Sequence, residues 1–116
     1  MSPKRFHLSA AQIRDLARGH GRCFATDIIT VDGQRVGYMY REEPSDGDDS
    51  GWRFFAGTED EAYINDPKNL EIYDVNTIAN YDPEVIPLLD APPGTAFERA
   101  SGSGPFVAAP LPDPEP

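Results

Sequence analysis

The chain has only one cysteine, Cys23, among its 116 residues. A single thiol excludes a disulfide within the chain and fits a reducing compartment. The chain also lacks a run of about 18 apolar residues, the length that a membrane-spanning helix needs. Its first residues lack the apolar stretch of a secretory signal peptide. We therefore expect a cytoplasmic protein that does not associate with a membrane.

Basic residues are scarce beyond the N-terminus. Ten Lys and Arg stand against twenty Asp and Glu, which gives a formal net charge of −10. Residues 1–22 carry five bases and one acid, whereas residues 23–116 carry five bases and nineteen acids. Such a surface repels the phosphates of nucleic acids and speeds association with a basic protein. Charge alone leaves open whether it serves a partner or only solubility.

The length suits one domain, and a hydrophobic fraction of 39% is enough for one core. The order of the expected elements indicates an α+β fold, with a mainly antiparallel sheet, an N-terminal helix and short helices between hairpins. We divide the chain into an N-terminal helical segment (1–22), an α+β domain (23–108) and a disordered, proline-rich tail (109–116).

A capping pattern predicts the N-terminal helix. Ser9 suits the N-cap, and Gln12, three residues later, completes a capping box. Leu8 and Ile13 stand at the positions of a hydrophobic staple. Gly19 is expected to end the helix.

The pair Asp32-Gly33 predicts a hairpin over residues 24–41, because this dipeptide suits a two-residue type I′ turn. The alternating pattern places five side chains on one strand face, where core is the favoured interpretation: Ile29, Val31, Val36, Tyr38 and Tyr40.

The remaining elements are shorter. Residues 42–51 form an acidic loop, followed by an aromatic strand at 52–55 and a short acidic helix capped by Thr58. A strand is expected at 70–73. Asp74 and Asp82 are expected to cap helices at about 75–80 and 83–89, before a last hairpin of residues 95–99 and 105–108.

Residues that could hold a metal are few. His7, His20 and Cys23 do not supply the four ligands of a closed zinc site. The acids of residues 46–49 resemble a calcium loop only loosely, because the glycine stands second and no closing Glu follows at the required spacing. A solvated charge run is the favoured interpretation, so we expect no metal and no cofactor.

Catalytic motifs are also missing. Cys23 could pair with His7 or His20, but both histidines lie in one N-terminal stretch. The chain has no Gly-x-Ser-x-Gly elbow and no glycine-rich phosphate loop before a helix. We expect a chain without catalytic residues that binds another protein.

Four blocks of sequence closely resemble a family of small bacterial domains. They are VGYMYREEP at 36–44, DSGWRFFAG at 49–57, IYDVNTIANYDP at 72–83 and GTAFER at 94–99. The family, formerly catalogued as a domain of unknown function, is now described as immunity-protein-like. The resemblance covers about residues 23–108 and implies a role in neutralising toxins exchanged between competing bacteria. It supplies no catalytic residues.

An immunity protein of this charge suits a basic toxin domain. We hypothesise that nine residues bind it: Glu42, Glu43, Asp46, Asp48, Asp49, Trp52, Glu59, Asp60 and Glu61. Two alternatives stay open, a housekeeping interaction domain without a toxin and an ion-binding protein that uses the acidic loop. The chain is expected to be a monomer or a weak dimer.

Overall fold

The computed structural model describes residues 4–101 and 104–112 of the chain. Six strands form one sheet in the order β4-β1-β3-β2-β5-β6. β1 runs parallel to β3, and the other four neighbouring pairs are antiparallel. The predicted α+β class with a mainly antiparallel sheet is therefore confirmed. The strands are β1 (Arg22–Thr26), β2 (Tyr38–Arg41), β3 (Asp49–Phe55), β4 (Leu70–Asp74), β5 (Ala96–Arg99) and β6 (Phe106–Ala109).

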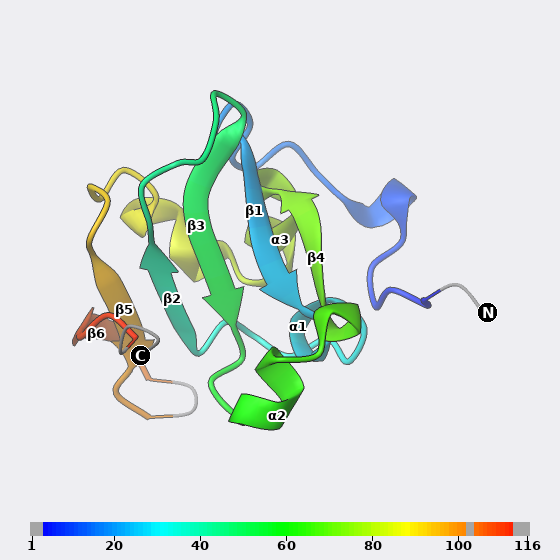
Figure 1. Cartoon of the computed structure of the whole chain (residues 1–116). Helices are drawn as coiled ribbons and strands as arrows, with labels where there is room; N and C mark the ends of the chain where they lie inside the picture. The colour runs from blue at the N-terminus through cyan, green and yellow to red at the C-terminus, as the bar shows by residue number, and fades with distance from the viewer. Residues whose placement is uncertain (1–3, 102–103, 113–116) are drawn as a thin grey trace.

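The helices are short and mostly lie on one side of the sheet. The α-helices are α1 (Asp27–Thr30), α2 (Glu61–Ile64) and α3 (Val75–Tyr81), and the 3₁₀ helices are η1 (Ala10–Gln12), η2 (Pro67–Asn69) and η3 (Pro83–Leu88). α3 lies behind the sheet, whereas no helix lies over β2 or β3 on the near face, and α2 lies beyond the end of β3 (Figure 1). We call these the covered face and the open face.

The core lies between the covered face and α3. Because side chains alternate along a strand, Trp52 and Phe54 of β3 point to this face together, and both are fully buried. They belong to one apolar cluster whose other main members are Cys23, Ala25, Ile29, Val36, Met39, Val75, Ile78, Ala79, Val85 and Leu89.

The predicted caps of the later helices are confirmed. The carboxylate of Asp74 accepts a hydrogen bond from the Asn76 amide at 2.9 Å, at the start of α3. The carboxylate of Asp82 accepts one from the Glu84 amide at 3.1 Å, at the start of η3. The strands expected at 52–55 and 70–73 are present, as is the last hairpin, formed by β5 and β6.

The hairpin predicted over residues 24–41 is wrong. β3 lies between β1 and β2 and pairs with both, so the two predicted strands do not pair with each other in the sheet. The apolar run after β1 instead makes the helical turn α1, which buries Ile29 and Thr30. Gly33 does adopt a positive φ of 79°, but it follows a helical turn and its amide bonds to the Ile29 carbonyl. Burial of Ile29 thus outweighs the strand propensity of the run.

The predicted N-terminal helix shrinks to the single turn η1. The capping box of Ser9 and Gln12 forms, but the backbone is already extended at Ile13. Side chains of α3 explain the difference. The Asn76 Oδ1 accepts hydrogen bonds from the amides of Leu16 and Ala17 at 2.7 and 2.8 Å, and the Asn80 Oδ1 accepts one from the Arg14 amide at 2.9 Å. These bonds replace the ones that a helix would have supplied.

Two further points concern the ends of elements. The N-cap of α2 is Asp60, whose carboxylate accepts a hydrogen bond from the Tyr63 amide at 2.8 Å, so the predicted cap Thr58 is wrong.

The predicted tail lies partly outside the described residues, and its disorder stays a prediction. Within residues 4–101 and 104–112, no helix is both long and apolar enough to cross a membrane.

Candidate functional site

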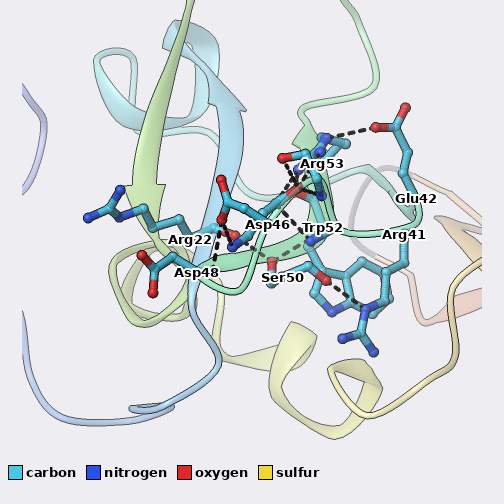
Figure 2. A network of polar contacts seen from close by, with 11 residues as sticks. Arg22, Arg41, Glu42, Asp46, Asp48, Ser50, Trp52 and Arg53 are labelled. Carbon is cyan, nitrogen blue, oxygen red and sulfur yellow. Dashed lines mark hydrogen bonds and ion pairs between the residues drawn. The ribbon is translucent and has the colours of Figure 1, made fainter.

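The acidic loop joins β2 to β3 and is held by its own carboxylates. The Asp46 Oδ1 accepts hydrogen bonds from the amides of Asp48 and Asp49 at 2.8 and 3.0 Å. The amide of Ser45 donates to Asp49 Oδ2 at 2.9 Å. Short polar side chains favour such turns because they bond to the backbone a few residues along the chain. The loop is therefore an ordered turn, in which the carboxylates of Asp46 and Asp49 accept hydrogen bonds from backbone amides of the loop itself. Figure 2 shows Asp46 within this network.

An ion pair ties this loop to the centre of the sheet. Arg53 donates through both terminal nitrogens to the two oxygens of Asp49, at 3.0 Å each, and through Nε to Glu42 at 3.2 Å. The side chains of Arg53 and Asp49 are only 10% and 11% exposed. The Arg53 guanidinium holds the pKa of Asp49 well below its usual range. Arg53 thus pairs with both carboxylates inside the molecule.

The acids near α2 also build local structure. Glu59 accepts hydrogen bonds from the amides of Ala56 and Gly57 at 2.7 and 2.8 Å, and from the hydroxyl of Thr26. Asp60 caps α2, as described above. Both carboxylates therefore already accept hydrogen bonds from the backbone between β3 and α2.

Three of the nine predicted residues remain as exposed acids with free carboxylates. The side chains of Glu43, Asp48 and Glu61 make no hydrogen bond or ion pair with any residue that the structure describes. Asp48 and Glu43 lie on the loop after β2, and Glu61 lies in the first turn of α2. No described side chain of the molecule therefore pairs with these three carboxylates.

Trp52 is a core residue, not a surface anchor. Its side chain is fully buried, its Nε1 donates to the Leu89 carbonyl at 3.1 Å, and the Arg41 guanidinium lies 5.7 Å from its ring centre. Alternation along β3 turns Trp52 and Phe54 towards α3, while Arg53 and Phe55 face the open side. A partner on the surface does not reach Trp52 in this conformation.

A groove on the open face was not expected from the sequence. It has a volume of about 980 Å³, and its floor is the aromatic cluster of Tyr38, Tyr40 and Phe55. The rings of Tyr40 and Phe55 stack with centres 5.8 Å apart and planes 8° apart. Tyr38 lies 5.9 Å from Tyr40 and 6.1 Å from Phe55, between ring centres. The pairing of Tyr38 opposite Phe55 across β2 and β3 brings the cluster together.

The sequence contained a signal for this cluster. Tyr38 and Tyr40 stand two residues apart and share a strand face, as predicted, but they do not share it with Val36 in a core. Both are half-buried, and their partner Phe55 comes from the strand that separates β2 from β1. The face could have been assigned only if the pairing of β2 with β3 had been known.

Four acids line the groove: Glu42, Glu43, Glu59 and Glu98. Two arginines line it as well, but their guanidinium groups point elsewhere. Arg41 donates to the carbonyls of Ser50 and Ala91, at 2.8 and 2.7 Å. Arg99 donates to the Val36 carbonyl at 2.8 Å and pairs with the buried Asp82. Burial and the Glu42 carboxylate raise the pKa of Tyr40 to about 12, so its phenol stays neutral. The groove is therefore aromatic at its base and negative at its rim.

Cys23, considered above as a nucleophile or a metal ligand, is buried. Burial raises the pKa of the Cys23 thiol far above its usual range, so the thiolate that a nucleophile or metal ligand needs is disfavoured. Across residues 4–101 and 104–112, no three His, Cys, Asp or Glu side chains are grouped in a way that could hold a metal ion.

Comparison with known proteins gives one family match, and the match covers nearly the whole sheet. A family model described as "Immunity protein Imm33 domain" matches residues 23–109. No curated protein and no solved structure matches the chain. The matched range runs from Cys23 in β1 to Ala109 at the end of β6, and so contains the loop, the groove and α3. The family model covers well over half of the chain and confirms the resemblance seen in the sequence blocks: the chain belongs to the Imm33 family of immunity protein domains.

Proposed function

We propose that this chain is a non-enzymatic immunity protein, which neutralises a bacterial toxin in the cytoplasm by binding it directly. The observation that carries the proposal is the family match over residues 23–109, because the family is one of immunity proteins. Direct binding needs shape and charge but no reactive group. The buried Cys23, with its raised pKa, is in keeping with that requirement.

We propose further that the toxin domain is basic. The chain carries a net charge of −10, so a basic partner would be attracted over a distance and would associate quickly. Toxins that attack nucleic acids need a basic surface for their substrate, and an acidic protein competes for that surface. The exposed acids Glu43, Asp48 and Glu61 are the members of the predicted interface whose carboxylates are free to contribute.

A capture experiment followed by a survival assay tests the function. The purified chain, immobilised at moderate salt, is used as bait in an extract of its native bacterium, and the retained proteins are identified by mass spectrometry. The gene of a retained basic protein is then expressed in a host with and without the chain. We expect the protein to be toxic alone and harmless when co-expressed. If only metabolic enzymes are retained and none is toxic, the immunity role is wrong and a housekeeping interaction domain takes its place.

A charge-reversal variant tests the chemistry of the partner. In the variant E43K/D48K/E61K three exposed carboxylates become ammonium groups, and we expect association with the captured toxin to slow at least tenfold at low salt. The matched control D15K/D32K/D90K reverses three other exposed acids, which lie outside both the loop and the groove. If the first variant protects the host as well as the natural chain does, these acids are not part of the interface.

A further inference from the structure

The open face carries a site of its own, apart from the tip of the acidic loop. Strands β2 and β3 form its base, and residues 93–94 and 42–43 close one end. Residues 56–59 and Ile64 of α2 close the other end, while Leu111 and Pro112 lie along the side. The Tyr38 hydroxyl donates to the Pro110 carbonyl at 2.9 Å, which holds this side in place. Figure 1 shows that no helix covers β2 or β3 on this face.

The groove combines aromatic and apolar side chains with an acidic rim. Three aromatic rings form the floor, and the side chains of Ile64 and Leu111 on its walls are 40% and 45% exposed. Contiguous apolar patches with a polar rim are typical of interaction sites.

The charged side chains of the groove favour a positively charged ligand. Its rim holds the carboxylates of Glu42, Glu43, Glu59 and Glu98. The guanidinium groups of Arg41 and Arg99 are bonded on the covered side and add no donor to the groove. Among the described residues, the side chains of Glu43 and Glu98 have no hydrogen-bond or ion-pair partner. A cation entering the groove thus meets free carboxylates above ring faces, the combination that suits arginine and lysine.

The same face already binds one arginine in this way. The guanidinium of Arg53 lies 4.7 Å from the ring centre of Phe24, while Asp49 and Glu42 accept its hydrogen bonds. Arg53 also borders the floor of the groove, because it lies directly opposite Tyr40 in the pairing of β2 with β3. An external arginine over Tyr40, held by Glu43 or Glu98, would repeat an arrangement that the chain itself uses.

We propose that this groove receives an extended basic segment of the toxin, with an arginine or lysine side chain over Tyr38 and Tyr40 and between the free carboxylates of the rim. The proposal rests on the proposed function for the identity of its partner. A second copy of the chain is disfavoured as the occupant, because each copy carries a net charge of −10 and the two acidic rims would repel each other. Nucleic acid is disfavoured for the same reason.

A short peptide makes the groove testable without the toxin. The probe is a tetra-arginine peptide with blocked ends, titrated into the full chain at low salt and followed by amide chemical shifts. We expect the shifts to concentrate on β2, on Phe55 and on residues 93–98. A blocked tetra-glutamate peptide is expected to cause none. Shifts confined to the loop tip around Asp48, or no binding of tetra-arginine, would overturn the proposal.

Matched variants separate the groove from general charge. E43K/E98K reverses two acids inside the groove, and D48K/E61K reverses two acids of the predicted interface outside it. Both change the net charge equally. We expect E43K/E98K to weaken tetra-arginine binding at least tenfold and D48K/E61K to weaken it less than threefold. Equal weakening by both pairs would mean that net charge, not the groove, binds the peptide.

The ring faces are tested by two changes at one position. Tyr40→Phe keeps the ring and removes the hydroxyl, so binding is expected to stay within twofold. Tyr40→Leu keeps an apolar side chain but removes the ring face, and binding is expected to fall at least fivefold. Thermal unfolding checks that both variants remain folded. If Tyr40→Leu binds as well as the natural chain does, the cation does not lie over this ring.

The toxin assay distinguishes failure of the groove from failure of the function. If the natural chain protects host cells and E43K/E98K protects them equally, immunity stands and the groove is not the docking site. If the natural chain protects against no captured protein, the proposed function fails, while the peptide titrations still decide whether the groove binds a basic segment. Loss of protection in E43K/E98K but not in D48K/E61K would support immunity and the groove, and would remove Asp48 and Glu61 from the proposed interface.

Discussion

The covered and open faces of the sheet are built by alternate residues of the same strands, yet they differ in almost every property. In β3, Trp52 and Phe54 face α3 and are fully buried, whereas Arg53 and Phe55 face the open side. The covered face is mainly apolar, is packed by helices, and contains the buried ion pair of Arg99 and Asp82. The open face is aromatic and charged. It carries the ion pair of Arg53 and Asp49 and the groove with the acidic rim.

This difference separates the residues that hold the fold from those available to a partner. Immunity proteins must be stable and must also present a surface that suits one toxin. The proposed docking groove lies on the open face and the core on the covered face, so on that proposal the two requirements fall on opposite sides of one layer of strands. The comparison predicts large losses of stability on the covered face and small ones on the open face, with one exception at Arg53.

The largest effect is expected from Trp52→Ala on the covered face. The change leaves a cavity under α3 and an unpaired Leu89 carbonyl, which together should lower the free energy of unfolding by about 4 kcal/mol. Urea denaturation measures this loss. Trp52→Phe serves as the control, because it keeps a ring and should lose much less. A loss below about 1 kcal/mol for Trp52→Ala would mean that the core does not depend on this ring.

A second large effect is expected at the one buried ion pair of the covered face that the described residues contain. Asp82 is fully buried, pairs with Arg99, and accepts a hydrogen bond from the Val36 amide at 3.2 Å. Asp82→Ala leaves the Arg99 charge without its main partner. Glu84 still contacts Arg99 at 3.2 Å, so we expect the lower end of the usual cost, about 3 kcal/mol. Urea denaturation of Asp82→Ala beside Glu84→Ala checks this, since removal of the exposed partner should cost much less.

The exception on the open face is the ion pair of Asp49 and Arg53. Asp49→Asn keeps the shape but removes the charge that Arg53 holds, so we expect a loss of about 2 kcal/mol at neutral pH. The pKa of Asp49 is lowered in the folded state, so its contribution is fully present above the unfolded pKa of about 4 and is lost as the pH falls towards the folded value.

The pH dependence provides the check on that exception. We expect the stabilities of Asp49→Asn and the natural chain to differ most at neutral pH and to converge as the pH falls below about 4. Denaturation by urea at a series of pH values measures both curves. A constant gap at every pH would show that the variant loses packing or hydrogen bonds and not a charge interaction.

The sequence predicted the elements whose signals are local. The aromatic strand at 52–55, the caps Asp74 and Asp82, and the last hairpin depend on neighbours a few residues away, and the structure contains all of them. The capping box at Ser9 was also real, but Asn76 and Asn80, more than 60 residues away, bind the following backbone and keep it extended. A local signal cannot reveal a distant competitor.

The surroundings of the candidate site depend on the same kind of long-range information. Composition identified the acidic loop, but it could not say which carboxylates the fold would use, because Arg53 and the backbone amides at 56–57 are brought to them by pairing. The groove was missed because β3 inserts between β1 and β2 and brings Phe55 beside Tyr38. The order of the strands in the sheet decides which carboxylates the fold uses and where the groove lies. Local sequence patterns do not reveal that order.

The smallest effect is expected from Ile72→Thr on the open face. Ile72 lies on the edge strand β4 opposite Phe24, and it is the most exposed of the large apolar side chains that the structure describes, at 59%. Threonine keeps the β-branched shape that suits a strand, so the free energy of unfolding should change by no more than about 0.5 kcal/mol. Ile78→Thr in α3 is the matched change on a fully buried isoleucine, where a hydroxyl without a partner should cost several times more. Thermal unfolding of the two variants side by side compares the same substitution on the two faces. Equal losses of stability would mean that Ile72 is buried in solution by another molecule.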